Sequence, residues 1–137
     1  MSRHLEPDAE KVRKQIKEMI SETATEDNSN LKKVDCLRSD DGRVMYAGEE
    51  LAKQVVTLRH YLGLGPDWGW TLWHFPAPRE LINDSSMYLV PLSGSASIPQ
   101  DESLTEGSFM CTTNNSMLSP RTTVLIFMKR NSHSQSC

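Results

Sequence analysis

The chain has 137 residues, with 15 lysines and arginines against 18 aspartates and glutamates, and its formal net charge is −3. This length suits one domain, and the acidic balance gives no overall attraction to nucleic acid or to an anionic membrane. No stretch approaches the roughly 18 consecutive apolar residues of a transmembrane helix. The first residues also lack the apolar segment of a secretory signal. We therefore expect a cytoplasmic or nuclear protein with no membrane association.

The N-terminal segment has the pattern of an amphipathic helix. Val12, Ile16 and Ile20 recur at intervals of four residues and form one narrow apolar stripe. We predict a helix within residues 1–22, followed by a polar linker over residues 23–30. Because the linker separates this helix from the rest, we expect its stripe to dock on another chain as a helix in a groove.

The central segment alternates strands and a second helix. Residues 33–38 and 43–47 are predicted to be the two strands of a hairpin, because they flank Asp41-Gly42, a dipeptide typical of a tight turn. Apolar residues at helical spacing predict a helix over residues 49–62, which Gly63 ends. Residues 68–75, 87–92, 108–112 and 122–128 have the composition of strands, whereas the polar segment 93–103 is expected to be mobile.

This element order predicts an α+β fold. We expect two helices packed on one face of a mostly antiparallel sheet, because no alternation of strand and helix typical of a parallel sheet is visible. Residues 31–130 would form this single α+β domain. The polar residues 131–137 would form a disordered C-terminal tail.

All three tryptophans lie within six residues, at Trp68, Trp70 and Trp73, and Phe75 follows them. As a strand, this segment places large apolar side chains on both faces, as a central strand between two layers requires. A second interpretation is a surface that binds a partner, since tryptophan is enriched among the residues that contribute most to protein interfaces. A third is that Trp68-Gly69-Trp70 resembles the hook motifs of Argonaute-binding proteins, which implies indoles inserted into a partner's pockets.

Catalytic and metal-binding patterns are weak. Cys36, Cys111 and Cys137 are widely spaced, which favours reduced thiols over a disulfide framework. Cys111 and His74 could meet across a sheet, as a cysteine-dependent hydrolase would need, but we interpret Cys111 as a small apolar core residue. No closely spaced ligands suggest a metal site, and we expect no cofactor.

Basic residues of the N-terminal region supply an alternative function. Lys14, Lys17, Lys32 and Lys33 would bind nucleic acid together with a sheet face. They alternate with acidic residues, so a solvated helix face is the simpler interpretation. Ser119 precedes a proline and is a candidate phosphorylation site.

We therefore predict a non-enzymatic module, an adaptor or complex subunit, that binds a protein partner whose identity the sequence leaves open. Self-association into a homo-oligomer is one alternative, and nucleic acid is the less favoured partner. The predicted binding residues are Trp68, Trp70, Trp73, Phe75, Val12, Ile16 and Ile20.

Overall fold

The computed structural model describes residues 3–25, 35–81, 86–98, 102–113 and 115–129. The expected tail, residues 131–137, and most of the expected linker, residues 23–30, lie outside these ranges. The elements in chain order are β1 (Arg3–His4), α1 (Pro7–Thr25), β2 (Asp35–Arg38), β3 (Val44–Ala47), α2 (Glu49–Tyr61), β4 (Trp68–Phe75), β5 (Arg79–Leu81), β6 (Met87–Ser93), β7 (Ser95–Ile98), β8 (Glu102–Thr105), β9 (Ser108–Thr112), β10 (Ser116–Leu118) and β11 (Thr122–Lys129).

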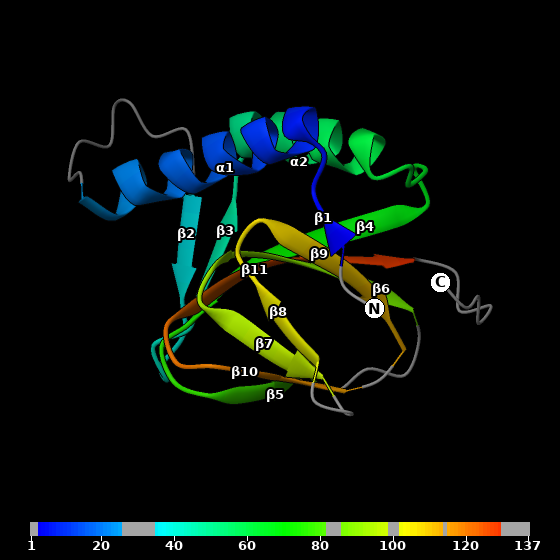
Figure 1. Cartoon of the computed structure of the whole chain (residues 1–137). Coiled ribbons are helices and arrows are strands. Elements are labelled where there is room, and N and C mark those ends of the chain that lie inside the picture. The colour runs from blue at the N-terminus through cyan, green and yellow to red at the C-terminus, as the bar shows by residue number, and fades with distance from the viewer. Residues whose placement is uncertain (1–2, 26–34, 82–85, 99–101, 114, 130–137) are drawn as a thin grey trace.

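The elements form three layers (Figure 1). The middle layer is a seven-stranded sheet in the order β1-β9-β6-β11-β4-β3-β2. Helices α1 and α2 cover one face of it, and a four-stranded sheet, β5-β10-β7-β8, covers the other. All the strand pairs are antiparallel. The predicted α+β class, with two helices on one face of an antiparallel sheet, is confirmed, and the second sheet is an addition to it.

Helix α1 is joined to the body of the protein by its apolar stripe. Val12, Ile16 and Ile20 are buried in a core shared with α2 and the seven-stranded sheet. The helix also continues to Thr25, beyond the predicted end. No helix in the described ranges is both long and apolar enough to cross a membrane.

Helix α2 ends where the sequence predicts. Gly63 adopts a φ of 77°, and its N–H donates to the carbonyl of His60 while the N–H of Leu64 donates to the carbonyl of Arg59. This pair of bonds is the Schellman motif, which requires a left-handed residue at the position that Gly63 occupies. Leu64 is buried after the motif, so the cap also sets the direction in which the chain enters β4.

Two apolar cores lie on opposite faces of the seven-stranded sheet. The helix-side core includes Leu72 of β4, and Trp68 and Trp70 pack against it. The core between the sheets includes Phe75, with Trp73 packed against it. The prediction of a central strand with apolar side chains on both faces is confirmed.

The chain passes from the larger sheet to the smaller one at Gly94, between β6 and β7. Here the hydroxyl of Ser119 donates to the carbonyl of Ser95 and contacts the hydroxyl of Thr122, which donates to the carbonyl of Ser119. Strand β7 lies inside the segment 93–103 that was expected to be mobile, and β8 begins in this segment and ends at Thr105. The sequence did not indicate these strands, because they form by pairing with each other and with β10, which local apolar periodicity does not reveal.

Candidate interaction surface

The four aromatic residues of β4 differ in their surroundings. Phe75 is buried between the sheets, whereas Trp68, Trp70 and Trp73 are half-buried. At the start of the strand, Trp68 meets Tyr88 edge to face with ring centroids 5.2 Å apart. The Trp68 and Trp70 indoles thus pack on the chain's own helix-side core. The resemblance to hook motifs implies indoles that insert into a partner's pockets, whereas these two indoles pack on the chain's own core.

Trp73 belongs to a ladder of rings and guanidinium groups. Its ring stacks on Phe75 at 5.9 Å and 20°. The guanidinium of Arg43 lies 5.6 Å from the Trp73 centroid, and that of Arg79 lies 5.5 Å from the Phe75 centroid. Such cation–π pairs place a charged group against an aromatic face without removing it from water. The ladder joins the hairpin, β4 and β5 at one end of the sandwich.

The Arg43 side chain is positioned by the hairpin turn. Its Nε lies 2.9 Å from Oδ2 of Asp41. A hydrogen bond from the Ser39 hydroxyl, followed by bonds from the backbone and side chain of Arg43, lowers the pKa of Asp41 to about 2. Asp41 therefore stays ionised at neutral pH and keeps Arg43 beside the indole. The sequence predicted this turn from Asp41-Gly42, and the φ of 90° at Gly42 confirms it.

An apolar row crosses the sheet from this ladder to an open edge. Trp73 of β4 pairs with Met45 of β3, and Met45 pairs with Leu37 of β2. In the other direction Trp73 pairs with Val124 of β11, which the second sheet buries completely. Met45 and Trp73 are half-buried, and Leu37 is 61% exposed. We call Leu37, Met45, Trp73 and Arg43 the Trp73 shelf.

The shelf is the part of the sheet face that extends past the second layer. Directly opposed residues of antiparallel strands point to the same face, so Leu37, Met45, Trp73 and Val124 share the face that the smaller sheet covers. Burial declines along the row towards β2. The sequence predicted Trp73 as a binding residue, but it did not indicate Leu37 or Met45, whose significance depends on the strand register.

The predicted helix-face residues do not contribute to an accessible surface. Val12, Ile16 and Ile20 are at most 7% exposed because they fill the core beneath α1. The neighbouring Arg13 is also buried and binds Glu10 and Glu106, which fastens the helix further. The expectation that this stripe docks on another chain is therefore corrected: the partner of the stripe is the chain's own sheet.

The residues of the nucleic-acid alternative are not gathered into one basic surface in the described ranges. Lys14 is exposed on α1, whereas Lys17 forms an ion pair with Glu106 at 2.7 Å. Lys32 and Lys33 lie outside the described residues. Of the two lysines of this set that the structure describes, Lys14 is the exposed one.

The remaining candidates are likewise held by structural contacts. The Ser119 hydroxyl lies in the corner between the two sheets, so its modification stays a prediction that would require this corner to open. His74 Nδ1 lies 2.8 Å from the Thr123 hydroxyl, and burial, then the charge of Arg38, lowers the pKa of His74. A neutral imidazole nitrogen can form this hydrogen bond with a hydroxyl group, so the contact needs no catalytic role.

The cysteines differ from the expectation of reduced thiols throughout. Cys111 is disulfide-bonded and Cys36 is not, while Cys137 lies outside the described residues. A cysteine in a disulfide is not a nucleophile, so the hydrolase pair of Cys111 and His74 is not supported. Among the described residues no group of three or more histidine, cysteine and carboxylate side chains is placed to hold a metal ion.

Three solved structures show distant similarity to the chain. An RmlC-like cupin protein from Desulfovibrio desulfuricans has 16% identity and a TM-score of 0.38, over 48% of this chain and 74% of its own. A mannose 6-phosphate isomerase from Bacillus subtilis has 9% identity and a TM-score of 0.43, over 69% of this chain and 28% of its own. A conserved Streptococcus pyogenes protein of unknown function has 15% identity and a TM-score of 0.40, over 70% and 82%.

No family model matches the chain, and no curated protein matches it. One of these structures is described as a cupin protein and another as an isomerase. With TM-scores below 0.5 they carry no conclusion about activity in this chain. The chain's own surface is consequently the basis of the function proposed below.

Proposed function

We propose that the protein is a protein-interaction module and that the Trp73 shelf is its binding surface. The observation that carries this proposal is the apolar row that leaves the core between the sheets and reaches Leu37 in the open. Edge strands of natural proteins usually carry charged or small residues where they face solvent, because an exposed apolar edge promotes association. Leu37 is the most exposed of the large apolar side chains in the described structure.

The chemistry of the shelf suits a protein surface. Tryptophan, methionine and arginine are the residue types enriched in protein interfaces relative to the remaining surface. Here Met45 and Trp73 offer apolar area, and Arg43 lies over the indole as a charged rim. A partner that covers this shelf would bury apolar area beside a cation that is already paired with Asp41. Such binding depends weakly on salt, unlike binding to phosphates.

The proposal is tested by retrieving bound proteins from cell extract with the purified chain and three variants. Leu37→Ser removes the exposed end of the row without disturbing a core. Met117→Ser is the matched control, since Met117 is 47% exposed on β10, in the second sheet. Lys14→Glu tests the nucleic-acid alternative.

We expect a defined set of proteins that Leu37→Ser loses and Met117→Ser retains, with binding of a purified member confirmed by calorimetry at two salt concentrations. If Leu37→Ser and Met117→Ser retrieved the same proteins in equal amounts, the role of the shelf would be refuted. Nucleic acid that is bound at low salt and lost in Lys14→Glu would support the alternative function instead.

A further inference from the structure

We propose that the partner of the Trp73 shelf carries an acidic segment, whose carboxylates bind Arg79 and Arg121 at the end of the sandwich beside the shelf. The inference rests on the proposed function, because it assumes that a partner protein covers the shelf. It adds the chemistry of that partner next to the apolar row. Three arginines from separate parts of the chain, Arg43, Arg79 and Arg121, lie at this end, and we call them the arginine end.

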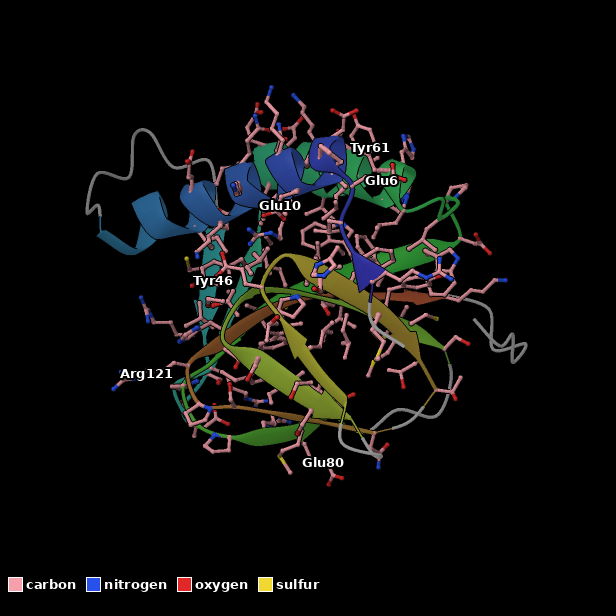
Figure 2. All side chains as sticks on the ribbon, viewed as in Figure 1. Glu6, Glu10, Tyr46, Tyr61, Glu80 and Arg121 are labelled. Atoms are coloured by element: carbon pink, nitrogen blue, oxygen red, sulfur yellow. The ribbon has the colours of Figure 1, made fainter. Side chains whose placement is uncertain are left out.

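Pro76 connects the segments that carry these arginines. The backbone N–H of Arg121 donates to the carbonyl of Pro76 at 3.2 Å. A Cβ added to Gly42 would lie 3.2 Å from Pro76 Cγ, so the hairpin turn just before Arg43 packs closely on the same proline. Arg79 begins β5 shortly after Pro76. Arg121 thus lies where the chain enters β11, at the end of the sandwich where the hairpin turns (Figure 2).

The contact of Arg79 with the protein leaves its hydrogen-bond donors accessible. Its guanidinium lies 5.5 Å from the Phe75 centroid, and the residue is exposed. A guanidinium over an aromatic ring still presents N–H groups around the edge of its plane, in the fork that matches a carboxylate. Because the ring positions the guanidinium before a ligand arrives, less side-chain freedom is lost on binding.

Among the described residues, the carboxylates of this end do not neutralise Arg79 and Arg121. Asp41 lies 2.9 Å from Arg43, so this pair adds no net charge. Glu80 follows Arg79 in β5, but neighbouring residues of a strand point to opposite faces, and Figure 2 shows Glu80 on the outer side of the smaller sheet. Two other exposed charges beside the hairpin turn are opposite in sign and cancel: Arg38 and Asp40.

Arg121 has a backbone conformation that suits other residue types better. Its φ is 59°, and among the described residues it is the one non-glycine residue with a positive φ. Glycine and asparagine adopt this conformation at a lower cost than arginine. An arginine here therefore costs backbone energy, which supports a binding role for its exposed side chain.

The position of the arginine end favours a protein carboxylate over the phosphates of nucleic acid. Trp73 of the shelf stacks on Phe75, over which Arg79 lies, so a partner that covers the indole is adjacent to this guanidinium. The net charge of the chain is −3, which opposes a long polyanion more than a short acidic segment. Ion pairs at these exposed arginines would add a salt-dependent contribution to the weakly salt-dependent contact of the shelf.

The inference is tested by fluorescence anisotropy with the full chain and a short labelled peptide in which glutamate alternates with serine. The matched probe has glutamine in place of glutamate, and an oligothymidylate of similar length represents nucleic acid. Arg79→Met removes the charge but keeps an unbranched side chain that packs well on Phe75. Arg121→Asn removes the charge and suits the positive φ. Lys14→Gln is the matched control, because it removes an exposed positive charge from α1.

We expect the glutamate peptide to bind at low salt and the glutamine peptide not to bind. Each arginine variant should weaken binding by about two- to fivefold and the double variant by about tenfold, as for exposed charge pairs. Lys14→Gln should leave binding unchanged. An anisotropy that is the same with both peptides, or equal losses in Lys14→Gln and the arginine variants, would refute the inference. Tighter binding of the oligothymidylate than of the glutamate peptide would also refute it, in favour of a phosphate backbone.

Failure of this inference and failure of the proposed function are distinguishable, because the probe has no apolar side chains to contact the Trp73 shelf. If the peptide does not bind but Leu37→Ser still loses proteins retrieved from extract, the proposed function stands and the acidic segment is refuted. If the peptide binds but Leu37→Ser and Met117→Ser retrieve the same proteins, the shelf is refuted as the neighbouring contact, and with it the partner inferred here.

Discussion

The contact of Arg13 beneath helix α1 provides a direct test of how the layers are held together. The Arg13 side chain is 2% exposed. Its Nε and Nη2 donate to the two carboxylate oxygens of Glu10 at 2.6 and 2.7 Å, and its Nη1 donates to Glu106 at 3.0 Å and to the carbonyl of Leu92 at 3.5 Å. Glu10 lies on the side of α1 that faces the sheet (Figure 2). One guanidinium thus connects α1, the turn before β9 and the end of β6.

Arg13→Ala removes these bonds, leaves two neighbouring carboxylates without their cation and opens a cavity. Losing one member of a buried ion pair costs about 3–5 kcal/mol. Glu10 and Glu106 remain 27% and 37% exposed, so water can solvate them and the cost falls to about 2–3 kcal/mol. Arg13→Met fills most of the volume and should cost about 1–2 kcal/mol, because the unpaired carboxylates remain.

Urea unfolding followed by circular dichroism measures these free energies of unfolding, with an unchanged m-value as the sign that the folded state is preserved. Lys14→Ala is the control, since this neighbour is exposed and should change the free energy by less than about 0.5 kcal/mol. Adding Glu106→Gln to Arg13→Met should recover part of the loss. Equal free energies for Arg13→Ala and Lys14→Ala would refute the reasoning.

Two further predictions concern the corner of the sandwich and the acid limb of stability. Gly94→Ala should destabilise the protein by about 2 kcal/mol or more in thermal melts, because the φ of Gly94 is 76° and a Cβ would lie 2.8 Å from Thr122 Cα. Gly63→Ala is the matched control: its φ is 77° but the space around it is open, so it should cost only about 1 kcal/mol. Hydrogen bonding to Arg13 lowers the pKa of Glu10; burial raises that of Glu106, but bonds from Lys17 and Arg13 lower it overall. Their stabilisation should therefore be complete above the ordinary glutamate pKa, near 4.3, and be lost as the pH falls through the lowered values; urea midpoints between pH 6 and pH 3 should fall less steeply in Glu106→Gln.

Local apolar periodicity and local turn residues were sufficient to predict most of the fold. The apolar periodicity of α2, the left-handed residue at Gly63 and the Asp41-Gly42 turn each depend on neighbouring residues, and each lies where it was predicted. The strands that were missed, β1, β5, β7, β8 and β10, are short and become ordered by pairing with distant segments. Ser95 and Ser119, for example, contact each other across 24 residues.

The proposed binding surface was harder to predict from the sequence, because it depends on the strand register and on which residues the second sheet covers. Whether an apolar residue is exposed is decided by the layer above it. Ile16 and Trp73 are both large and apolar, yet α2 and the seven-stranded sheet bury the first, while the second sheet leaves the other half-exposed. Leu37 carries no distinguishing sequence signal. Its exposure becomes significant only when β2 is found at the sheet edge, in register with Met45.

The apolar content of the chain also changes meaning once two cores are present. The chain has seven methionines and three tryptophans, and Met87 and Met110 fill the second core, between the sheets. The exposed side chains of Tyr61, Met117 and Met128 lie on three different elements, where isolated apolar residues are ordinary. Leu37 differs from them because it is the end of a continuous row that begins inside the protein. This continuity with the core, rather than the number of apolar residues, distinguishes the Trp73 shelf and supports the proposal that a partner covers it.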